Sequence, residues 1–367
     1  MFIKKLELTD YRNYSKQCFE FSDGINIICG DNAQGKTNCA EAIFYLCTGY
    51  SPRAAKDKQV IGYGKQKSEI SGTAVSRYGN VNVSVDFYSD ANKNIKINGV
   101  QVLKIGELLG NINSVFFNPG ELKLIQESPE DRRRFLDISL SQMSKRYFYS
   151  LQRYKKILSQ RNNLLKNTDT ELIYDTLPIW DLQLCKEASA IIAARNDYVK
   201  ILSPLAKDAH SFITDKKEDL EVMFDWKYEG TEEEIAAAFA ADLKEKIEKD
   251  IILGYTTVGP HRDDLKIKIN GEDVRTYGSQ GQQRTAALSL KLAELEIFKK
   301  HFGEYPVLIL DDAMSELDAS RRQNLIDRIK GIQTIVTCTS VDEEIFKDRN
   351  YKKFIISDGK VISTAEI

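Results

Sequence analysis

The pattern of hydrophobic and polar positions alternates between strands and helices at both ends of the chain. Near the N-terminus, residues 2–8 partly alternate, and the apolar residues 24–29 run directly into Gly30, which predicts two strands. A helix is expected from Lys36 to about Cys47, with Gly49 as its stop. Near the C-terminus the expected order is helix Gln280–His301, strand Val307–Leu310, helix Ala319–Lys330 and strand Thr334–Cys338.

Residues 68–103 follow a different pattern, in which apolar and polar side chains alternate. Val81–Phe87 and Ile95–Val100 are the clearest segments, and they predict strands with one buried face. Asn98-Gly99 is a strong hairpin signal because both residues tolerate positive φ. We therefore expect an antiparallel sheet beside the strands that alternate with helices.

The middle of the chain is charged and predominantly helical. This character begins near Pro129 and continues to about Asp250, with Pro178 and Pro204 as the expected interruptions. A short β-like piece, Leu220–Trp226, lies within it. Strand-like sequence returns at Gly254–Val258 and Leu265–Ile269, followed by a second Asn-Gly turn at Asn270-Gly271.

These patterns predict an α/β fold in which one domain is split in sequence. Residues 1–129 and 251–367 would form a head, with a mixed sheet and an antiparallel β subdomain. Residues 130–250 would form an inserted helical arm.

Composition adds limits on location and partners. The formal charge is −2, so attraction to nucleic acid has to come from local clusters of basic residues. Six cysteines occur without a C-x-x-C pair, which argues against a zinc site and fits a reducing compartment. Without a signal peptide or an apolar stretch long enough to span a bilayer, a cytoplasmic protein with no membrane partner is expected.

A phosphate-binding loop follows the second predicted strand and opens a helix. Its sequence matches G-x-x-x-x-G-K-[ST] and consists of Gly30, Asp31, Asn32, Ala33, Gln34, Gly35, Lys36 and Thr37, followed by Asn38. The glycines let backbone N–H groups surround phosphates, and Lys36 adds a point charge. The Thr37 hydroxyl is suited to Mg²⁺. ATP and Mg²⁺ are therefore the expected ligands.

Two further segments complete an ATPase pattern. The buried strand Val307–Leu310 ends in Asp311, a candidate Mg²⁺ ligand, and Asp312, a candidate base for the attacking water. Ser279, with Gly281 and Gln282, opens a helix. Alone, Ser279 is a helix cap; with the other two motifs, this segment resembles the signature of ABC-type ATPases. There, one subunit contacts the γ-phosphate held by another.

More motifs resemble those of the RecF family of bacterial DNA replication and repair proteins, and they span almost the whole chain. They are Tyr11-Arg12-Asn13-Tyr14, Ser128-Pro129, Arg132-Arg133-Arg134-Phe135-Leu136-Asp137, Trp180-Asp181, Gly259-Pro260-His261-Arg262-Asp263-Asp264, Gly278–Arg284, and Asp311-Asp312 leading to Ser315-Glu316-Leu317-Asp318.

This resemblance implies a head like those of Rad50 and SMC proteins, with a short helical arm. It implies slow, DNA-stimulated ATP hydrolysis and ATP-dependent homodimerisation on double-stranded or gapped DNA. It also implies assistance to RecA loading with RecR as partner and RecO in the same pathway.

Two departures from the ABC pattern affect the expected rate. Asp312 stands where a glutamate is usual, and Thr339-Ser340 follows the last predicted strand in place of a histidine. Asn118 is the candidate for the loop that senses Mg²⁺. An ATP-binding structural head with little or no hydrolysis remains the alternative. A transporter subunit is disfavoured by the charged insertion.

A basic segment provides the candidate DNA contacts. Residues 132–166 carry a local excess of nine positive charges, which is typical of a phosphate-tracking surface but also of a solvated helix face. The candidates are Arg132, Arg133, Arg134, Lys145, Arg146, Lys155 and Lys156. Contacts would be to the DNA backbone and independent of sequence.

Two loops are open to alternative interpretations. Arg12 and Asn13 precede the P-loop strand and could contact nucleotide phosphate or base, or form an ordinary turn. His261 lacks metal-ligand spacing and a neighbouring nucleophile, so an ion-paired supporting loop is expected there.

Overall fold

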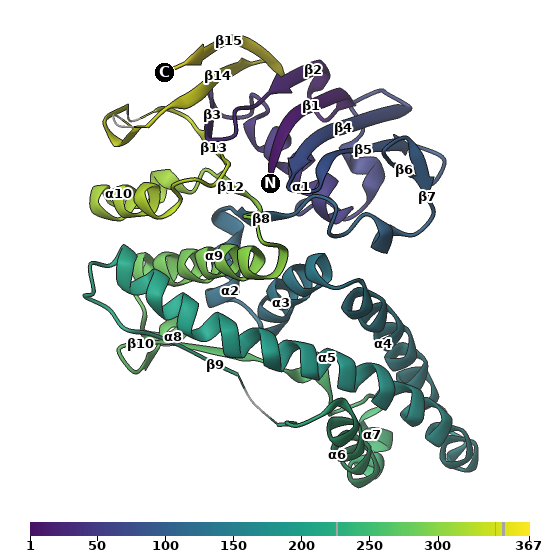
Figure 1. Cartoon of the computed structure of the whole chain (residues 1–367). Helices are drawn as coiled ribbons and strands as arrows, with labels where there is room; N and C mark the ends of the chain where they lie inside the picture. Colours follow the sequence, from purple (N-terminus) through teal and green to yellow (C-terminus); the bar gives the residue numbers. More distant parts are fainter. Residues whose placement is uncertain (225–226, 342, 347–348) are drawn as a thin grey trace.

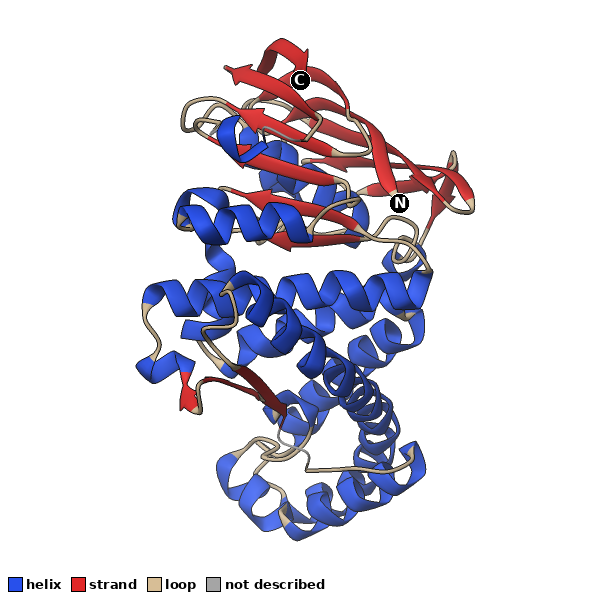
Figure 2. Cartoon of the chain, turned by 60° about the vertical axis from the view of Figure 1, so that its left-hand side comes forward, coloured by secondary structure: helices blue, strands red, loops and turns tan. Residues whose placement is uncertain are grey.

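The computed structural model describes residues 1–224, 227–341, 343–346 and 349–367. Strands gather at one end of the molecule and helices at the other, as Figures 1 and 2 show from two sides. A mixed sheet and an antiparallel sheet form the β-rich end, and long helices form a lobe beneath them. The predicted α/β head with an inserted helical region is confirmed.

The mixed sheet has the strand order β15-β14-β3-β13-β12-β8. All neighbours are parallel except β15, which pairs antiparallel with β14 at the edge. The side chains of Ile28 and Ile309 lie in one hydrophobic core, whereas Ile27 and Leu308 lie in another. Burial of both faces explains why these strands are almost continuously apolar. The bounds are β3 (Ile25–Cys29), β8 (Ser114–Phe117), β12 (Val307–Asp311), β13 (Thr334–Cys338), β14 (Tyr351–Ser357) and β15 (Lys360–Glu366).

The antiparallel sheet has the order β2-β1-β4-β5-β6-β7. It shares one core with helix α1 (Lys36–Thr48), which ends at Gly49 as predicted. Asn98 and Gly99, with φ of 50° and 80°, form the predicted turn between β6 and β7. Strand β2 was not predicted. The bounds are β1 (Phe2–Tyr11), β2 (Tyr14–Glu20), β4 (Lys67–Ser76), β5 (Gly79–Tyr88), β6 (Asn94–Ile97) and β7 (Val100–Val102).

The helical lobe is organised around α5 (Thr170–Ile213), which packs against α4, α6 and α9. Pro178 and Pro204 do not interrupt α5, contrary to the prediction. Both prolines are exposed, so water can reach the backbone carbonyls that lose a partner. The other helices are α2 (Lys123–Gln126), α3 (Pro129–Met143), α4 (Lys145–Leu164), α6 (Glu232–Glu245), α7 (Ile247–Leu253), α8 (Val274–Tyr277), α9 (Gln280–Phe302) and α10 (Ala319–Arg328).

The lobe also contains a small antiparallel sheet of β9 (Leu220–Phe224), β10 (Leu265–Ile269) and β11 (Glu272–Asp273). Because β10 pairs with β9, the lobe continues past the predicted boundary at residue 250, which falls inside α7. The strand expected at 254–258 is absent from this described segment. Trp226, the predicted end of the β-like piece, lies outside the described residues.

The helices of the described residues include none that is long and apolar enough to cross a membrane.

Candidate nucleotide-binding site

The predicted phosphate-binding loop connects β3 to α1. Gly35 has a φ of 117° and Ala33 a φ of 66°, so the loop turns back on itself before the helix begins. The Lys36 ammonium lies inside the loop, where it donates to the carbonyl oxygens of Gly30 at 2.7 Å and Asp31 at 2.8 Å. A side chain at Gly30 would meet the Ile356 carbonyl oxygen at 2.3 Å, so the loop requires glycine there. Asp31, Asn32 and Ala33 are exposed, which leaves this turn accessible to a phosphate chain.

Two threonine hydroxyls bind the carboxylate at the end of β12, one from the P-loop and one from β13. The Asp311 carboxylate accepts hydrogen bonds on Oδ1 from Thr37 at 3.0 Å and from Thr337 at 2.6 Å. Burial raises the pKa of the Asp311 carboxyl above its ordinary value, and the two hydroxyl donors oppose that rise. Two predicted Mg²⁺ ligands that are far apart in sequence are thus in direct contact. Thr337 was missed as a functional residue.

Asp312 lies beside this contact but is exposed to solvent. Its backbone has a φ of 53°, and its N–H donates to the Thr337 hydroxyl at 3.0 Å. The Ser315 hydroxyl donates to the Asp312 carbonyl at 2.9 Å and lies 3.3 Å from its carboxylate. Holding a non-glycine residue in this left-handed conformation costs free energy, which the surrounding hydrogen bonds offset. The result is a carboxylate that faces water next to the Asp311 site.

The loop between β1 and β2 supports the P-loop from outside. Asn13 donates to the Gln34 carbonyl at 2.9 Å and accepts from the Asn38 amide at 2.8 Å. The Arg12 guanidinium makes a bidentate pair with Glu41, at 3.0 and 2.7 Å. These contacts give Asn13 and Asn38 a supporting role. Direct contact of Arg12 or Asn13 with a nucleotide stays a prediction.

A cavity of ≈ 420 Å³ opens beside Thr37 and Asp311. Asn118 lines it, so the candidate for Mg²⁺ sensing shares a cavity with both predicted Mg²⁺ ligands. Cationic side chains also line it, from Arg53, Lys123 and Arg134. Arg53 and Lys123 were not predicted, because only the fold brings the segment after α1 and the start of α2 beside Thr37 and Asp311.

The signature segment lies at the start of α9. The Ser279 hydroxyl accepts the N–H of Gln282 at 3.3 Å, and the Gln282 side chain accepts the N–H of Ser279 at 2.9 Å. This reciprocal capping box confirms Ser279 as a helix cap. Ser279 is exposed, and the Gly281 carbonyl accepts from Arg321 at 3.2 Å. The N-terminus of a 23-residue helix therefore faces solvent, where it can bind an anion.

Three of the seven predicted DNA-binding cations, Arg132, Lys145 and Arg146, are paired with acids that are distant in sequence. Arg132 is buried, and its guanidinium makes a bidentate pair with Asp264 at 2.5 and 3.0 Å. A buried and fully engaged guanidinium is inaccessible to a DNA backbone, so the structure removes Arg132 from the predicted set. Arg133 is half-buried and donates to the Asp263 carbonyl at 2.8 Å.

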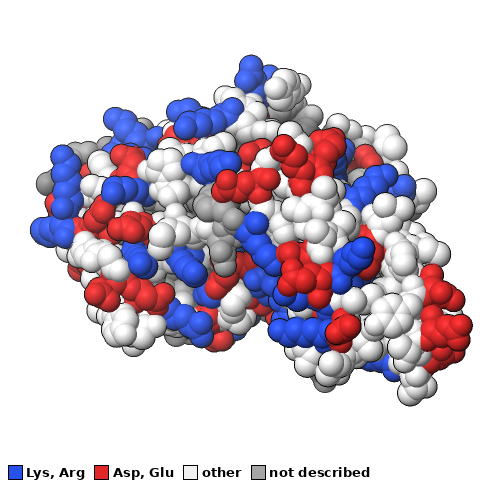
Figure 3. Space-filling model, turned by 90° about the horizontal axis from the view of Figure 1, so that it is seen from below, with Lys and Arg blue, Asp and Glu red and all other residues white. Residues whose placement is uncertain are grey.

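The exposed cations of the set differ in their surroundings. Lys145 pairs with Glu107 at 3.3 Å and Arg146 with Glu232 at 2.5 Å. Arg134, Lys155 and Lys156 are exposed and have no ion pair within the described part of the chain. Figure 3 shows basic and acidic side chains interspersed on the face seen from below. Ion pairs with acids elsewhere in the fold thus neutralise part of the local excess of positive charge.

The loop that contains His261 is ion-paired, but not through the histidine. Asp263 pairs with Arg195 at 2.9 Å, and Asp264 pairs with Arg132. His261 instead bonds to the Tyr154 hydroxyl at 2.6 Å and the Thr256 carbonyl at 3.1 Å. Burial lowers the pKa of His261 to about 4, which makes the imidazole neutral near pH 7.

Comparisons with known proteins agree with this architecture. The family described as RecF/RecN/SMC N terminal domain matches residues 2–361. The chain is 45% identical over 347 residues to the DNA replication and repair protein RecF of Ruminiclostridium cellulolyticum, with 93% of each chain covered. It is 45% identical over 359 residues to the RecF protein of Lachnoclostridium phytofermentans, covering 96% of this chain and 98% of the relative.

Solved structures extend the comparison to three dimensions. The recombination mediator protein RecF-ATPrS in the RecFOR pathway has a TM-score of 0.89 and 37% identity, and covers 98% of this chain and 97% of its own. An SMC head bound to the C-winged helix domain of ScpA has a TM-score of 0.59 at 16% identity, which shows a shared fold alone. The family match and the relatives agree over nearly the full length. The chain belongs to the RecF family of DNA replication and repair proteins, within the larger group of RecF, RecN and SMC heads.

Proposed function

We propose that this protein binds ATP with Mg²⁺, dimerises on DNA when ATP is bound, and hydrolyses the ATP slowly. The observation that carries the proposal is that Asp311 Oδ1, at the end of β12, accepts hydrogen bonds from the Thr37 hydroxyl of the P-loop at 3.0 Å and from the Thr337 hydroxyl at 2.6 Å. Relatives of 37% and 35% identity are described as RecF-ATPrS and RecF-ATP, which supports ATP as the nucleotide.

In this proposal the P-loop N–H groups and Lys36 bind the phosphates. Thr37 and Asp311 would hold Mg²⁺, which needs few protein ligands when phosphates and water complete its shell. When bound, the ion neutralises charge that develops on the phosphates. Asp312 is exposed beside Asp311 and would accept a proton from the attacking water. Its short side chain and the Ser315 hydrogen bonds fit a slow reaction.

Dimerisation follows from the position of the signature segment. Ser279 is exposed at the N-terminus of α9, and its hydroxyl is engaged only locally, with the backbone of Gln282, within the described residues. We infer that Ser279, Gly281 and Gln282 contact the γ-phosphate bound by a second copy of the chain. ATP would then act as a bridge between the copies, and hydrolysis would release them.

DNA and partner proteins complete the proposal. Arg134, Lys155 and Lys156 are the exposed cations best placed to contact a duplex backbone, with Lys145 and Arg146 available if their surface ion pairs open. The relatives named for the RecFOR pathway support RecR and RecO as partners. We propose that the protein assists RecA loading at gapped DNA in the cytoplasm.

The test is the mass of the protein in solution without nucleotide, with ADP and with ATP. ATP should convert monomer to dimer, and Lys36→Met and Ser279→Arg should each abolish the conversion. For Ser279→Arg, ATP binding should persist, because the lesion lies outside the chain's own P-loop. A protein that stays monomeric with ATP bound would contradict the proposal.

The second candidate is a structural head that binds ATP without hydrolysing it. The hydrogen bond from the Ser315 hydroxyl to the Asp312 carboxylate favours it, because a carboxylate that already accepts a hydrogen bond is a weaker base. The measurement is ATP turnover of Asp312→Asn beside that of the unmodified protein. We expect the ATP turnover of Asp312→Asn to fall about 100-fold, the lower end of the contribution of a general base. Equal turnover would support the structural head.

A further inference from the structure

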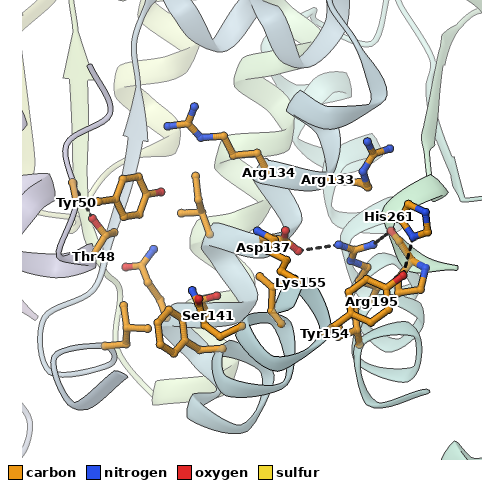
Figure 4. A pocket seen from close by; sticks show the side chains of 18 of the residues that line it. Thr48, Tyr50, Arg133, Arg134, Asp137, Ser141, Tyr154, Lys155, Arg195 and His261 are labelled. Carbon is orange, nitrogen blue, oxygen red and sulfur yellow. Dashed lines mark hydrogen bonds and ion pairs between the residues drawn. The ribbon is translucent and has the colours of Figure 1, made fainter. Parts of the chain in front are cut away.

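A second cavity lies between the head and the helical lobe, apart from the P-loop. Its volume is ≈ 630 Å³, within the range of small-molecule sites. Residues of α3, α4 and α5 line it, together with the segments around Tyr50 and Ile105. Gln152 and Lys155 on its lining are exposed, so the cavity opens to solvent. Figure 4 shows the side chains that point into it.

One part of the lining is apolar. Ile105, Leu109, Ile138, Leu151 and Leu158 contribute aliphatic surface from different segments. Apolar lining with a few polar groups is the general character of sites for organic ligands. Part of any ligand that fills this cavity should therefore be aromatic or aliphatic, because that part leaves water for an apolar surface.

The polar groups of the lining favour an anion. Arg134 and Lys155 lack an ion pair within the described chain, whereas the acid Asp137 is already engaged by Arg195 at 2.8 Å. Glu130, an exposed acid on the same lining, limits the excess positive charge. The balance suits an anion of low charge better than a polyphosphate.

A buried hydroxyl lacks a partner at the same place. The Tyr50 hydroxyl has no hydrogen-bond partner among the described residues, although it is shielded from solvent. Figure 4 shows it directed toward the middle of the cavity, below Arg134. A buried polar group without a partner is unfavourable, so a ligand oxygen that reaches this hydroxyl would supply the missing hydrogen bond.

We propose that this cavity is a second ligand site, which binds a small organic anion carrying an aromatic or branched aliphatic group. Arg134, Lys155 and the Tyr50 hydroxyl bind the anionic group, and the aliphatic lining holds the apolar group. Arg134 and Ile138 also line the cavity beside Thr37 and Asp311, so the two sites share a wall. The ligand site itself does not depend on the proposed ATPase function.

The test uses anilinonaphthalene sulfonate, an aromatic anion whose fluorescence rises in apolar surroundings. The full chain without nucleotide should bind it saturably at one site. Lys155→Glu should weaken binding at least about tenfold, since it replaces attraction with repulsion at the anion. Lys156→Glu is the matched control, because it makes the same charge change at the next exposed position, outside the cavity lining. Its affinity should stay within about twofold of the unmodified protein.

Three further arms separate the alternatives. Tyr50→Phe should weaken binding a few-fold, because it removes only the hydroxyl. Naphthoate should displace the probe, and neutral methylnaphthalene at the same concentration should not. Absence of saturable binding, or equal effects of Lys155→Glu and Lys156→Glu, would overturn the proposal. Displacement by a single-stranded oligonucleotide but not by naphthoate would assign the cavity to nucleic acid and would also overturn it.

Discussion

Replacing Arg161 by leucine tests whether the basic segment contributes to the fold or to DNA contact. Arg161 belongs to the positive run at 132–166, yet its side chain is 0% exposed. Its guanidinium pairs with Asp250 at 2.8 Å and Asp181 at 2.6 Å, and donates to the Thr256 hydroxyl at 2.8 Å. These bonds join α4, α5, α7 and the segment after α7.

The expected cost follows from what remains after the substitution. The Asp250 side chain is also 0% exposed, so Arg161→Leu leaves a buried carboxylate without its cation. Removal of one partner of a buried ion pair costs about 3–5 kcal/mol. At roughly 2–4 °C per kcal/mol, the apparent melting temperature should fall by about 10 °C. Arg161→Leu with Asp250→Leu should recover much of this loss, because an apolar pair can replace a buried ion pair of similar volume.

The assay is thermal unfolding followed by circular dichroism, with Lys156→Ala as the control. Lys156 lies on α4 as well but is exposed, so its loss should change stability by no more than about 0.5 kcal/mol. A single Arg161 variant that melts like the control would refute the reasoning. So would a double variant that is no more stable than the single one.

Three other predictions concern pH, catalysis and DNA. The pKa of His261 is lowered to about 4 from 6.5, so the folded state binds this proton more weakly than the unfolded state. The free energy of unfolding should therefore fall by ~3 kcal/mol as the pH drops from 6.5 to 4. In His261→Gln, the melting temperature should depend less on pH over that range. Thr337→Val removes the hydroxyl that donates to the Asp311 carboxylate and accepts from the Asp312 N–H. It should lower ATP turnover about tenfold and leave ATP affinity unchanged. An equal loss of ATP affinity would contradict this positioning role. Alanine at both Lys155 and Lys156 should lower the slope of log affinity against log salt for duplex DNA by about 2, and an unchanged slope would exclude both contacts.

The P-loop, the strand ending in Asp311 and the Asn98-Gly99 turn could be predicted because each depends on neighbouring residues. A glycine-rich turn between an apolar strand and a helix carries its own conformational signal. Helix α5 shows the limit of such local rules. Its two prolines are helix breakers in isolation, but packing against neighbouring helices outweighs them when the rings lie on the exposed side.

The electrostatic role of the basic segment could not be predicted from the sequence. Arg132 meets Asp264, and Arg161 meets Asp250, across 132 and 89 positions of the chain. Counting charge within a window therefore overestimates the positive surface. Thr337 was missed for a similar reason, because its role depends on the parallel pairing of β13 with β12.

The central claim is that each ATP site needs the P-loop of one copy and the signature of another, and mixing two inactive variants tests it most directly. Lys36→Met and Ser279→Arg should each be inactive alone. In a dimer of the two, one site carries both lesions and the other carries neither. Because neither variant dimerises alone, the dimers in an equal mixture should all be mixed, and each has one intact site of two, so the mixture should regain up to about half of the unmodified ATP turnover. A mixture as inactive as its components, or a Ser279→Arg protein with full turnover alone, would contradict the composite site.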